Sequence, residues 1–145
     1  MEFKIQQKAS GKHLICIIDD VKKINQVHGL NEAETTYAKE AFSKEQTIVT
    51  INRYSNFVFI YLLKNKKTDW QTREACRKAG ADLQGICNKY KLGEVTISNL
   101  SGPAQAATLL GEGMALANYQ FLKYRSDAKK TTNTLHTIFF TKDSA

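Results

Sequence analysis

Gly111-Glu112-Gly113-Met114-Ala115-Leu116-Ala117-Asn118-Tyr119-Gln120-Phe121-Leu122-Lys123-Tyr124-Arg125 is the stretch that decides the fold, because its apolar residues follow a helical period. Gly111 and Gly113 flank the apolar stripe, although each glycine inside a helix costs about 1 kcal/mol relative to alanine. We therefore predict a helix that faces the core and that a neighbouring strand or helix approaches closely at its glycines. The stripe, which begins upstream of the quoted residues, consists of Ala107, Leu110, Met114, Ala117, Phe121 and Tyr124.

Strands and helices alternate around this helix. The predicted order from Phe57 onward is strand 57–63, helix 68–90, strand 94–100, a helix starting at 101–103, and strand 135–140. Strands joined through helices in this way run parallel, with right-handed crossovers. A polar loop is expected over 125–134.

The first third of the chain adds elements of both kinds. Its predicted elements are strands 3–5 and 13–18, a helical segment 21–29, a helix from the capping residue Asn31 to about Ser43, and a strand 47–52 that forms a hairpin with 57–63. The whole pattern predicts the α/β class, with a mixed, largely parallel sheet flanked by helices on both faces.

The bulk composition is that of an ordinary globular domain. The chain has 145 residues, of which 42% are hydrophobic and 24% charged, and we expect residues 1–145 to form one domain. The longest apolar run, Phe57–Leu63, is far shorter than the roughly 20 residues that a membrane-spanning helix needs. The N-terminal residues lack the features of a signal peptide, so a cytoplasmic protein without a membrane partner is expected.

The three cysteines, Cys16, Cys76 and Cys87, support a reducing compartment. Cys76 and Cys87 lie on one predicted helix, where eleven residues separate them by roughly 16 Å, too far for a disulfide. All three are interpreted as small buried apolar residues.

The residues offer no catalytic or metal-binding constellation. The three histidines are far apart in sequence, and neither a His-x-x-x-His nor a Cys-x-x-Cys pair occurs. Asp19 and Asp20 follow a predicted central strand, where α/β sheets often place functional groups, but a cap on the following helix is the favoured interpretation. The loop 63–67 has no glycine with which to cradle a phosphate.

The formal net charge of +7 permits acidic partners. Lysine clusters such as Lys64, Lys66 and Lys67 are candidate anion contacts, and a nucleic-acid-binding module stays open as an alternative function. Few aromatic residues are interleaved with these clusters, so stacking of bases on an open platform is not indicated.

The late helix resembles the end of the N-terminal domain in the leucyl (cytosol) aminopeptidase family. A Glu-Gly pair, a leucine and a Tyr-x-Phe-x-x-Tyr-Lys/Arg pattern carry the resemblance, and the order of the upstream elements agrees, including a helix over 73–81. The matching positions are Glu112, Gly113, Leu116, Tyr119, Phe121, Tyr124 and Arg125. The chain departs from the family at Tyr61-Leu62-Leu63-Lys64, where a Gly-Leu-Gly-Lys-like turn is usual and only the lysine is kept.

The resemblance implies a macro-domain-like three-layer sandwich without catalytic residues. In that family two divalent metals, zinc or manganese, are held in a C-terminal domain around a motif like Asn-Thr-Asp-Ala-Glu-Gly-Arg, which does not occur here. The chain is therefore expected to be an excised or truncated N-terminal accessory domain that contains no metal or cofactor. Its partners would be its own catalytic domain and the other subunits of a hexamer, in which it supports assembly and access to the active site.

Three exposed positions are candidate contacts with such partners. Glu112 and Tyr119 are predicted near the polar side of the late helix, and Trp70 in the first turn of the helix 68–90. A further alternative that the macro-domain likeness leaves open is an ADP-ribose-binding module, although the missing glycine loop argues against it.

Overall fold

The computed structural model describes residues 2–6, 13–27, 30–53, 56–64, 68–102, 105–123 and 135–141, without the side chains of 119–123. The predicted loop 125–134, Lys66 and Lys67 lie outside this description. The elements, in chain order, are β1 (Glu2–Gln6), β2 (Leu14–Ile18), the 3-10 helix η1 (Val21–Gln26), α1 (Glu32–Ser43), β3 (Ile48–Asn52), β4 (Phe57–Leu62), α2 (Asp69–Lys89), β5 (Glu94–Asn99), α3 (Ala106–Lys123) and β6 (Thr137–Thr141).

The strands form one six-stranded sheet in the order β1-β6-β5-β2-β4-β3. Every neighbouring pair is parallel except β3 and β4, which form the predicted antiparallel hairpin. The crossover from β4 through α2 to β5 passes β2, which lies between these two strands in the sheet. The mixed, largely parallel sheet is therefore confirmed.

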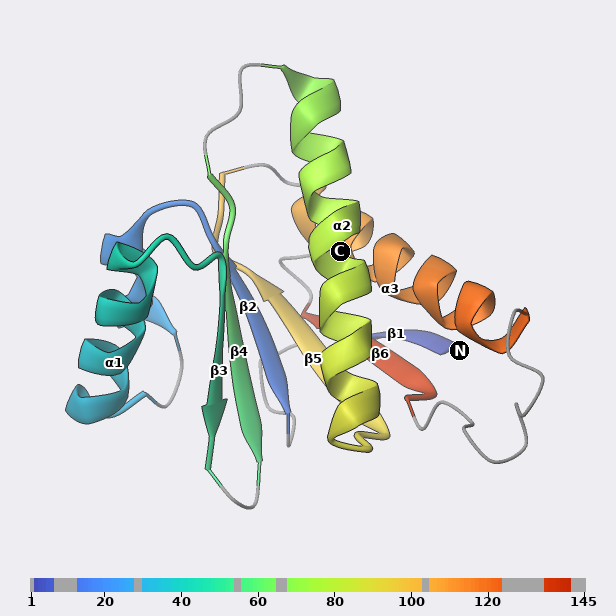
Figure 1. Cartoon of the computed structure of the whole chain (residues 1–145), viewed down its shortest axis with the longest axis horizontal. Helices are drawn as coiled ribbons and strands as arrows, with labels where there is room; N and C mark the ends of the chain where they lie inside the picture. The colour runs from blue at the N-terminus through green and yellow to red at the C-terminus, as the bar shows by residue number, and fades with distance from the viewer. Residues whose placement is uncertain are drawn as a thin grey trace.

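Helices cover both faces of the sheet, as the α/β pattern predicts (Figure 1). Helices α2 and α3 pack on one face over a core that includes Ile17, Phe59 and Ile97. On the other face, η1 and α1 pack over a second core that includes Ile18 and Ile60. All five residues of β2 are buried, because this strand is covered from both sides.

Local capping signals position two of the helices. The Asn31 side chain accepts a hydrogen bond from the backbone N–H of Glu34, and the Glu34 side chain accepts one from the backbone N–H of Asn31. Thr68 caps α2 by accepting a hydrogen bond from the backbone N–H of Gln71. Both helix starts are where the sequence predicts them.

The first described helical residue of α3 is Ala106, later than the predicted start at 101–103. Ser101 and Gly102 are non-helical, and the backbone N–H of Gly102 donates to the Asp19 carboxylate at 2.8 Å. Pro103 lies outside the described residues.

Helices α2 and α3 touch through backbone at two glycines. A Cβ atom on Gly80 of α2 would lie 2.1 Å from the carbonyl oxygen of Leu110, and one on Gly113 of α3 would lie 2.1 Å from the carbonyl oxygen of Arg77. A Cβ atom on Gly111 would lie 2.8 Å from the ring of Phe140 in β6. The predicted close approach of a helix and a strand to these α3 glycines is confirmed.

Within the described residues, Ala107, Leu110 and Met114 of the predicted α3 stripe are buried, and Ala117 is partly buried. The side chains of Phe121 and Tyr124 lie outside the description. On α2, Tyr90 is 39% exposed and packs against Phe57 with ring centroids 4.5 Å apart. Gln84, a polar residue, is buried between α2 and α3, where its amide nitrogen lies 3.4 Å from the side-chain oxygen of Asn118.

The cysteines are free and buried, as predicted. Burial raises the pKa of Cys16 and Cys87 to about 12 and that of Cys76 to about 11. The three thiols are therefore protonated at neutral pH and pack as apolar groups.

Candidate functional site

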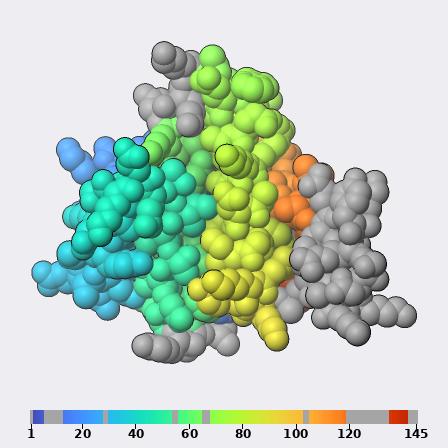
Figure 2. Space-filling model, viewed as in Figure 1, coloured from blue at the N-terminus to red at the C-terminus, as the bar shows by residue number. Residues whose placement is uncertain are grey.

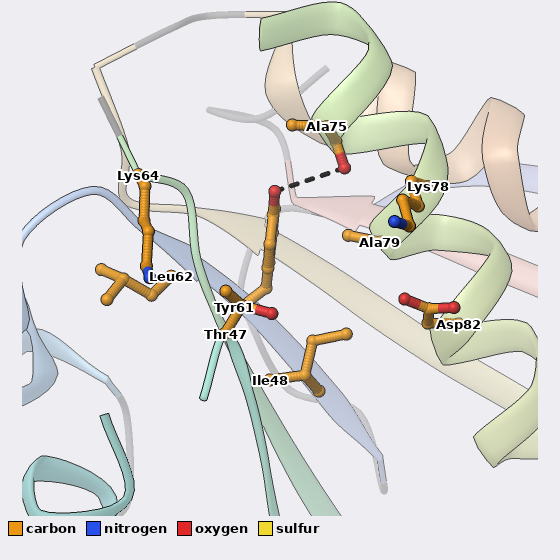
Figure 3. A pocket seen from close by; sticks show the side chains of 9 residues that line it. All are labelled: Thr47, Ile48, Tyr61, Leu62, Lys64, Ala75, Lys78, Ala79 and Asp82. Atoms are coloured by element: carbon orange, nitrogen blue, oxygen red, sulfur yellow. Dashed lines mark hydrogen bonds between the residues drawn. The ribbon is translucent and has the colours of Figure 1, made fainter. Parts of the chain in front are cut away.

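A cleft with a volume of about 290 Å³ lies between the β3–β4 hairpin and helix α2. One wall of the cleft is formed by the hairpin, including Thr47 and Ile48, and the other by α2. Figure 3 shows Tyr61 between these two walls. The α2 wall consists of small and charged residues, among them Lys78 and Asp82. Because Ala75 and Ala79 are short, this part of the helix leaves the space in front of Tyr61 open.

Tyr61 joins the two walls of the cleft. Its side chain is buried in the sheet, and its hydroxyl donates to the backbone carbonyl of Ala75 at 3.3 Å. Burial raises the pKa of the Tyr61 phenol, and the nearby carboxylate of Asp82 raises it further. The hydroxyl is therefore protonated throughout the physiological pH range and serves as a neutral donor.

The charged side chains of the cleft do not neutralise one another. Lys78 points toward Tyr61, and Asp82 follows one helical turn later (Figure 3). The salt bridges within the described ranges include neither residue. Lys64, a predicted anion contact, lies on the other side of β4 with its amine beside Leu62 (Figure 3). It therefore adds positive charge to one end of the cleft, although it does not converge on Lys78.

The hairpin side of the cleft is the open edge of the sheet, because β3 pairs with β4 alone. Backbone hydrogen bonds join Leu62 N to Thr47 O at 2.8 Å and Arg53 N to Asn56 O at 2.9 Å. With this register, the pairs Val49–Ile60 and Ile51–Val58 are the hydrogen-bonded ones. The alternate residues Ile48 and Thr50 consequently direct their N–H and C=O groups away from β4.

The other place where an α/β sheet can bind a ligand, the carboxyl ends of its strands, is bridged by side chains. The Asp19 carboxylate at the end of β2 accepts from the backbone N–H of Gly102 after β5 and pairs with Lys23 at 2.7 Å. The amine of Lys23 also donates to the carbonyl of Leu100 at 2.9 Å. Asp20, in contrast, caps η1 by accepting from the backbone N–H of Lys22. The predicted capping role is therefore correct for Asp20 and wrong for Asp19.

Asp19→Asn is expected to lower the free energy of unfolding by about 1 kcal/mol at pH 7, because it weakens charge-assisted hydrogen bonds that are partly exposed. The bond to Lys23 holds the pKa of Asp19 below its ordinary value, with a further contribution from Gly102 N–H. A depressed pKa contributes stability above the unfolded value, roughly 3.9, and this contribution disappears as the pH falls through the folded value.

The difference between wild type and Asp19→Asn in urea unfolding should therefore be constant near neutral pH and narrow as the pH falls below the unfolded value of roughly 3.9. Asp20→Asn is the matched control, since asparagine caps a helix as well as aspartate does, and it should change stability by only a few tenths of a kcal/mol. A pH-independent deficit for Asp19→Asn would contradict a role for the carboxylate charge.

Two of the three predicted interface residues, Trp70 and Glu112, are exposed on the helical layer. Trp70, in the first turn of α2, is 70% exposed. Arg77 follows seven residues later on the same side of α2, and its guanidinium lies 3.5 Å from the carboxylate of the exposed Glu112 on α3. The side chain of Tyr119 lies outside the described residues. Trp70 and Arg77 thus share one side of α2, and Arg77 links that side to Glu112 on α3.

Within the described ranges, no three His, Cys, Asp or Glu side chains come together as a metal site requires. No helix in the described part of the chain has both the length and the hydrophobicity to cross a membrane.

Sequence reasoning missed most of the α2–β3 cleft. Of its residues only Lys64 was predicted as an anion contact; Lys78 was noted as part of a basic cluster with Arg77, and Asp82 was not singled out. The available signal was the spacing of Ala75, Lys78, Ala79 and Asp82, which places small and charged residues together on one side of α2.

No protein-family model matches the chain, and no curated protein sequence matches it. Among solved structures, it is similar to a mutant of tomato leucine aminopeptidase, with a TM-score of 0.66 and 11% identical residues. The similarity covers 97% of this chain and 32% of that chain. At this level of identity the comparison shows a shared fold, and the chain spans about a third of the length of its structural neighbour.

Proposed function

We propose that this chain is a non-catalytic accessory domain of a metal-dependent leucyl aminopeptidase, an enzyme that removes N-terminal residues from peptides. The observation that carries the proposal is the extent of the fold similarity. Nearly the whole chain superimposes on a third of a leucine aminopeptidase, which leaves two thirds of that protein for other tasks.

The late helix supports the same assignment. Gly113, one of the positions that resembles the aminopeptidase family, is where α3 meets the backbone of α2 at Arg77. A side chain at this position would separate the helices, so the packing of the domain gives a physical reason for the glycine. Glu112, the preceding position of the pattern, pairs with the same Arg77.

Catalysis in this proposal belongs to a partner domain that holds zinc or manganese. The accessory domain would contact that domain, or a neighbouring subunit of a cytoplasmic hexamer, through the exposed surface around Trp70 and Glu112. Trp70 is an exposed tryptophan, a residue type enriched at protein interfaces, and it lies on the same side of α2 as Arg77, which pairs with Glu112.

The test compares two preparations in hydrolysis of leucine p-nitroanilide with added Mn²⁺ or Zn²⁺. One is the recombinant 145-residue chain, and the other is the native protein captured from its source with an antibody against this chain. We expect turnover by the native preparation and none by the recombinant chain. Metal-dependent turnover by the recombinant chain would contradict a non-catalytic domain, and an inactive native preparation would contradict the aminopeptidase assignment.

A further inference from the structure

We propose that the α2–β3 cleft binds an extended acidic peptide, which adds a strand to the open edge of β3 and places alternate side chains against α2. This inference goes beyond the accessory role above and does not depend on it. It rests on the backbone of β3, on the shape of the cleft and on the charges along it.

The backbone of β3 offers hydrogen-bonding groups in the required arrangement. Ile48 and Thr50 direct N–H and C=O groups outward from the sheet, since the intervening residues Val49 and Ile51 pair with β4. An incoming strand that pairs with these two residues would form main-chain hydrogen bonds regardless of its sequence.

The two edges of the sheet differ in how they are protected. β1, at one edge, carries Glu2 and Lys4 in its five residues. β3, at the other, has the sequence Ile-Val-Thr-Ile-Asn and contains neither a charge nor a proline. Charges and prolines are the usual means by which proteins keep a sheet edge from pairing with another chain. The β3 edge lacks both, so its sequence favours the addition of a strand.

The cleft provides space for the side chains of such a strand. Val49 and Ile51 are buried on the α1 side of the sheet. Ile48 and Thr50, on the opposite face, are only half-buried, because α2 does not extend over β3. In Figure 2 the surface of the β3–β4 hairpin is visible between α1 and α2. The cleft volume of about 290 Å³ is at the lower limit of ligand pockets, which suits a few side chains of a peptide.

The charges of the cleft favour an acidic peptide. Lys78 lines the cleft on its α2 side, with Asp82 one turn further along α2, and Lys64 adds positive charge from the other side of β4. Lys78 makes no ion pair within the described residues, so its amine is available to an acidic side chain that faces α2. The net charge of +7 adds long-range attraction for the same class of peptide.

The first experiment measures fluorescence anisotropy of a labelled hexapeptide of alternating valine and threonine with one central glutamate. Two matched peptides serve as controls, one with alternate backbone amides N-methylated and one with lysine in place of glutamate. Wild-type protein should bind the glutamate peptide at least about tenfold more tightly than either control, a difference of 1.4 kcal/mol. Equal binding of the N-methylated peptide, or no binding of the glutamate peptide at millimolar concentration, would overturn the proposal.

The second experiment uses variants of the two elements that form the cleft. Thr50→Pro removes an N–H that faces away from β4, and proline is tolerated at such edge positions, so the sheet should remain intact while binding falls at least about tenfold. Lys78→Glu should reverse the preference from the glutamate to the lysine peptide. Lys22→Glu, an equal charge change at an exposed position of η1, is its control and should keep the wild-type preference.

If Thr50→Pro does not fold, hydrogen exchange on the wild-type protein tests whether the peptide binds at the β3 edge. The amides of Ile48 and Thr50 should become protected when the glutamate peptide is added, while those of β1, at the opposite edge, should not. Protection at β1 instead of β3, or at neither edge, would contradict the proposed site.

Discussion

Gly80→Ala is expected to lower the free energy of unfolding by about 3 kcal/mol or more, the upper range for an overpacked core. The added methyl group would lie 2.1 Å from the carbonyl oxygen of Leu110 and 3.0 Å from the backbone nitrogen of Met114. Both obstacles are backbone atoms of α3, so a change of rotamer cannot relieve the overlap. The two helices would have to separate, which would disturb the core beneath them.

Gly85→Ala on the same helix is the matched control. A Cβ atom there has no atom within 4 Å, and alanine favours a helix by about 0.5–1 kcal/mol over glycine. The two substitutions are chemically identical, yet they should shift the urea midpoint in opposite directions at an unchanged slope. Similar effects at both positions would show that Gly80 does not lie against the backbone of α3.

Phe59→Ala is expected to lower the free energy of unfolding by about 3–5 kcal/mol, the range for removing a buried aromatic ring. Phe59 is fully buried on β4, a strand that pairs with both β2 and β3, and its ring stacks on Phe57 at a centroid distance of 5.8 Å. Its loss would leave a cavity between the sheet and α2.

Phe3→Ala provides the comparison for Phe59→Ala. Phe3 also stacks on a phenylalanine, Phe140, but it is 50% exposed on the edge strand β1. Its removal should cost about 1 kcal/mol, close to the value of an aromatic pair alone. Thermal and urea unfolding of both variants measure this difference. Equal losses would contradict the assignment of β4 to the interior of the sheet and β1 to its edge.

Features encoded by neighbouring residues were predictable from the sequence. Asn31 and Thr68 cap their helices because a side-chain oxygen reaches a backbone N–H three residues later. The β3–β4 hairpin follows from two apolar runs around a short polar turn. The two glycines of α3 signalled a close contact, since nothing within the helix itself explains their cost.

Features that depend on distant contacts were not predictable. The bond from Gly102 to Asp19 assigns different roles to two adjacent aspartates. Gln84 is buried because α3 covers it, although the sequence presents it as a polar helix residue. The position of β1 beside β6 joins the two ends of the described chain, and no local pattern specifies this pairing.

The candidate cleft belongs to the same group of features. Helix α2 packs closely on α3 through Gly80 and Gly113. In this position α2 does not cover β3, and the cleft lies between them. Sequence periodicity shows which side of α2 faces the core, but it does not show how far the helix lies from the edge of the sheet. Only Lys64 was predicted as an anion contact in advance, because it belongs to a cluster of lysines.

Peptide mapping of the native polypeptide tests the accessory-domain assignment most directly. The protein is captured from its source with an antibody against this chain, its intact mass is determined, and its tryptic peptides are sequenced. We predict a mass well above the 16.3 kDa of this chain, together with peptides of a further domain rich in metal-binding aspartate and glutamate. A native mass of 16.3 kDa, with peptides from these 145 residues alone and no associated peptidase, would contradict the account.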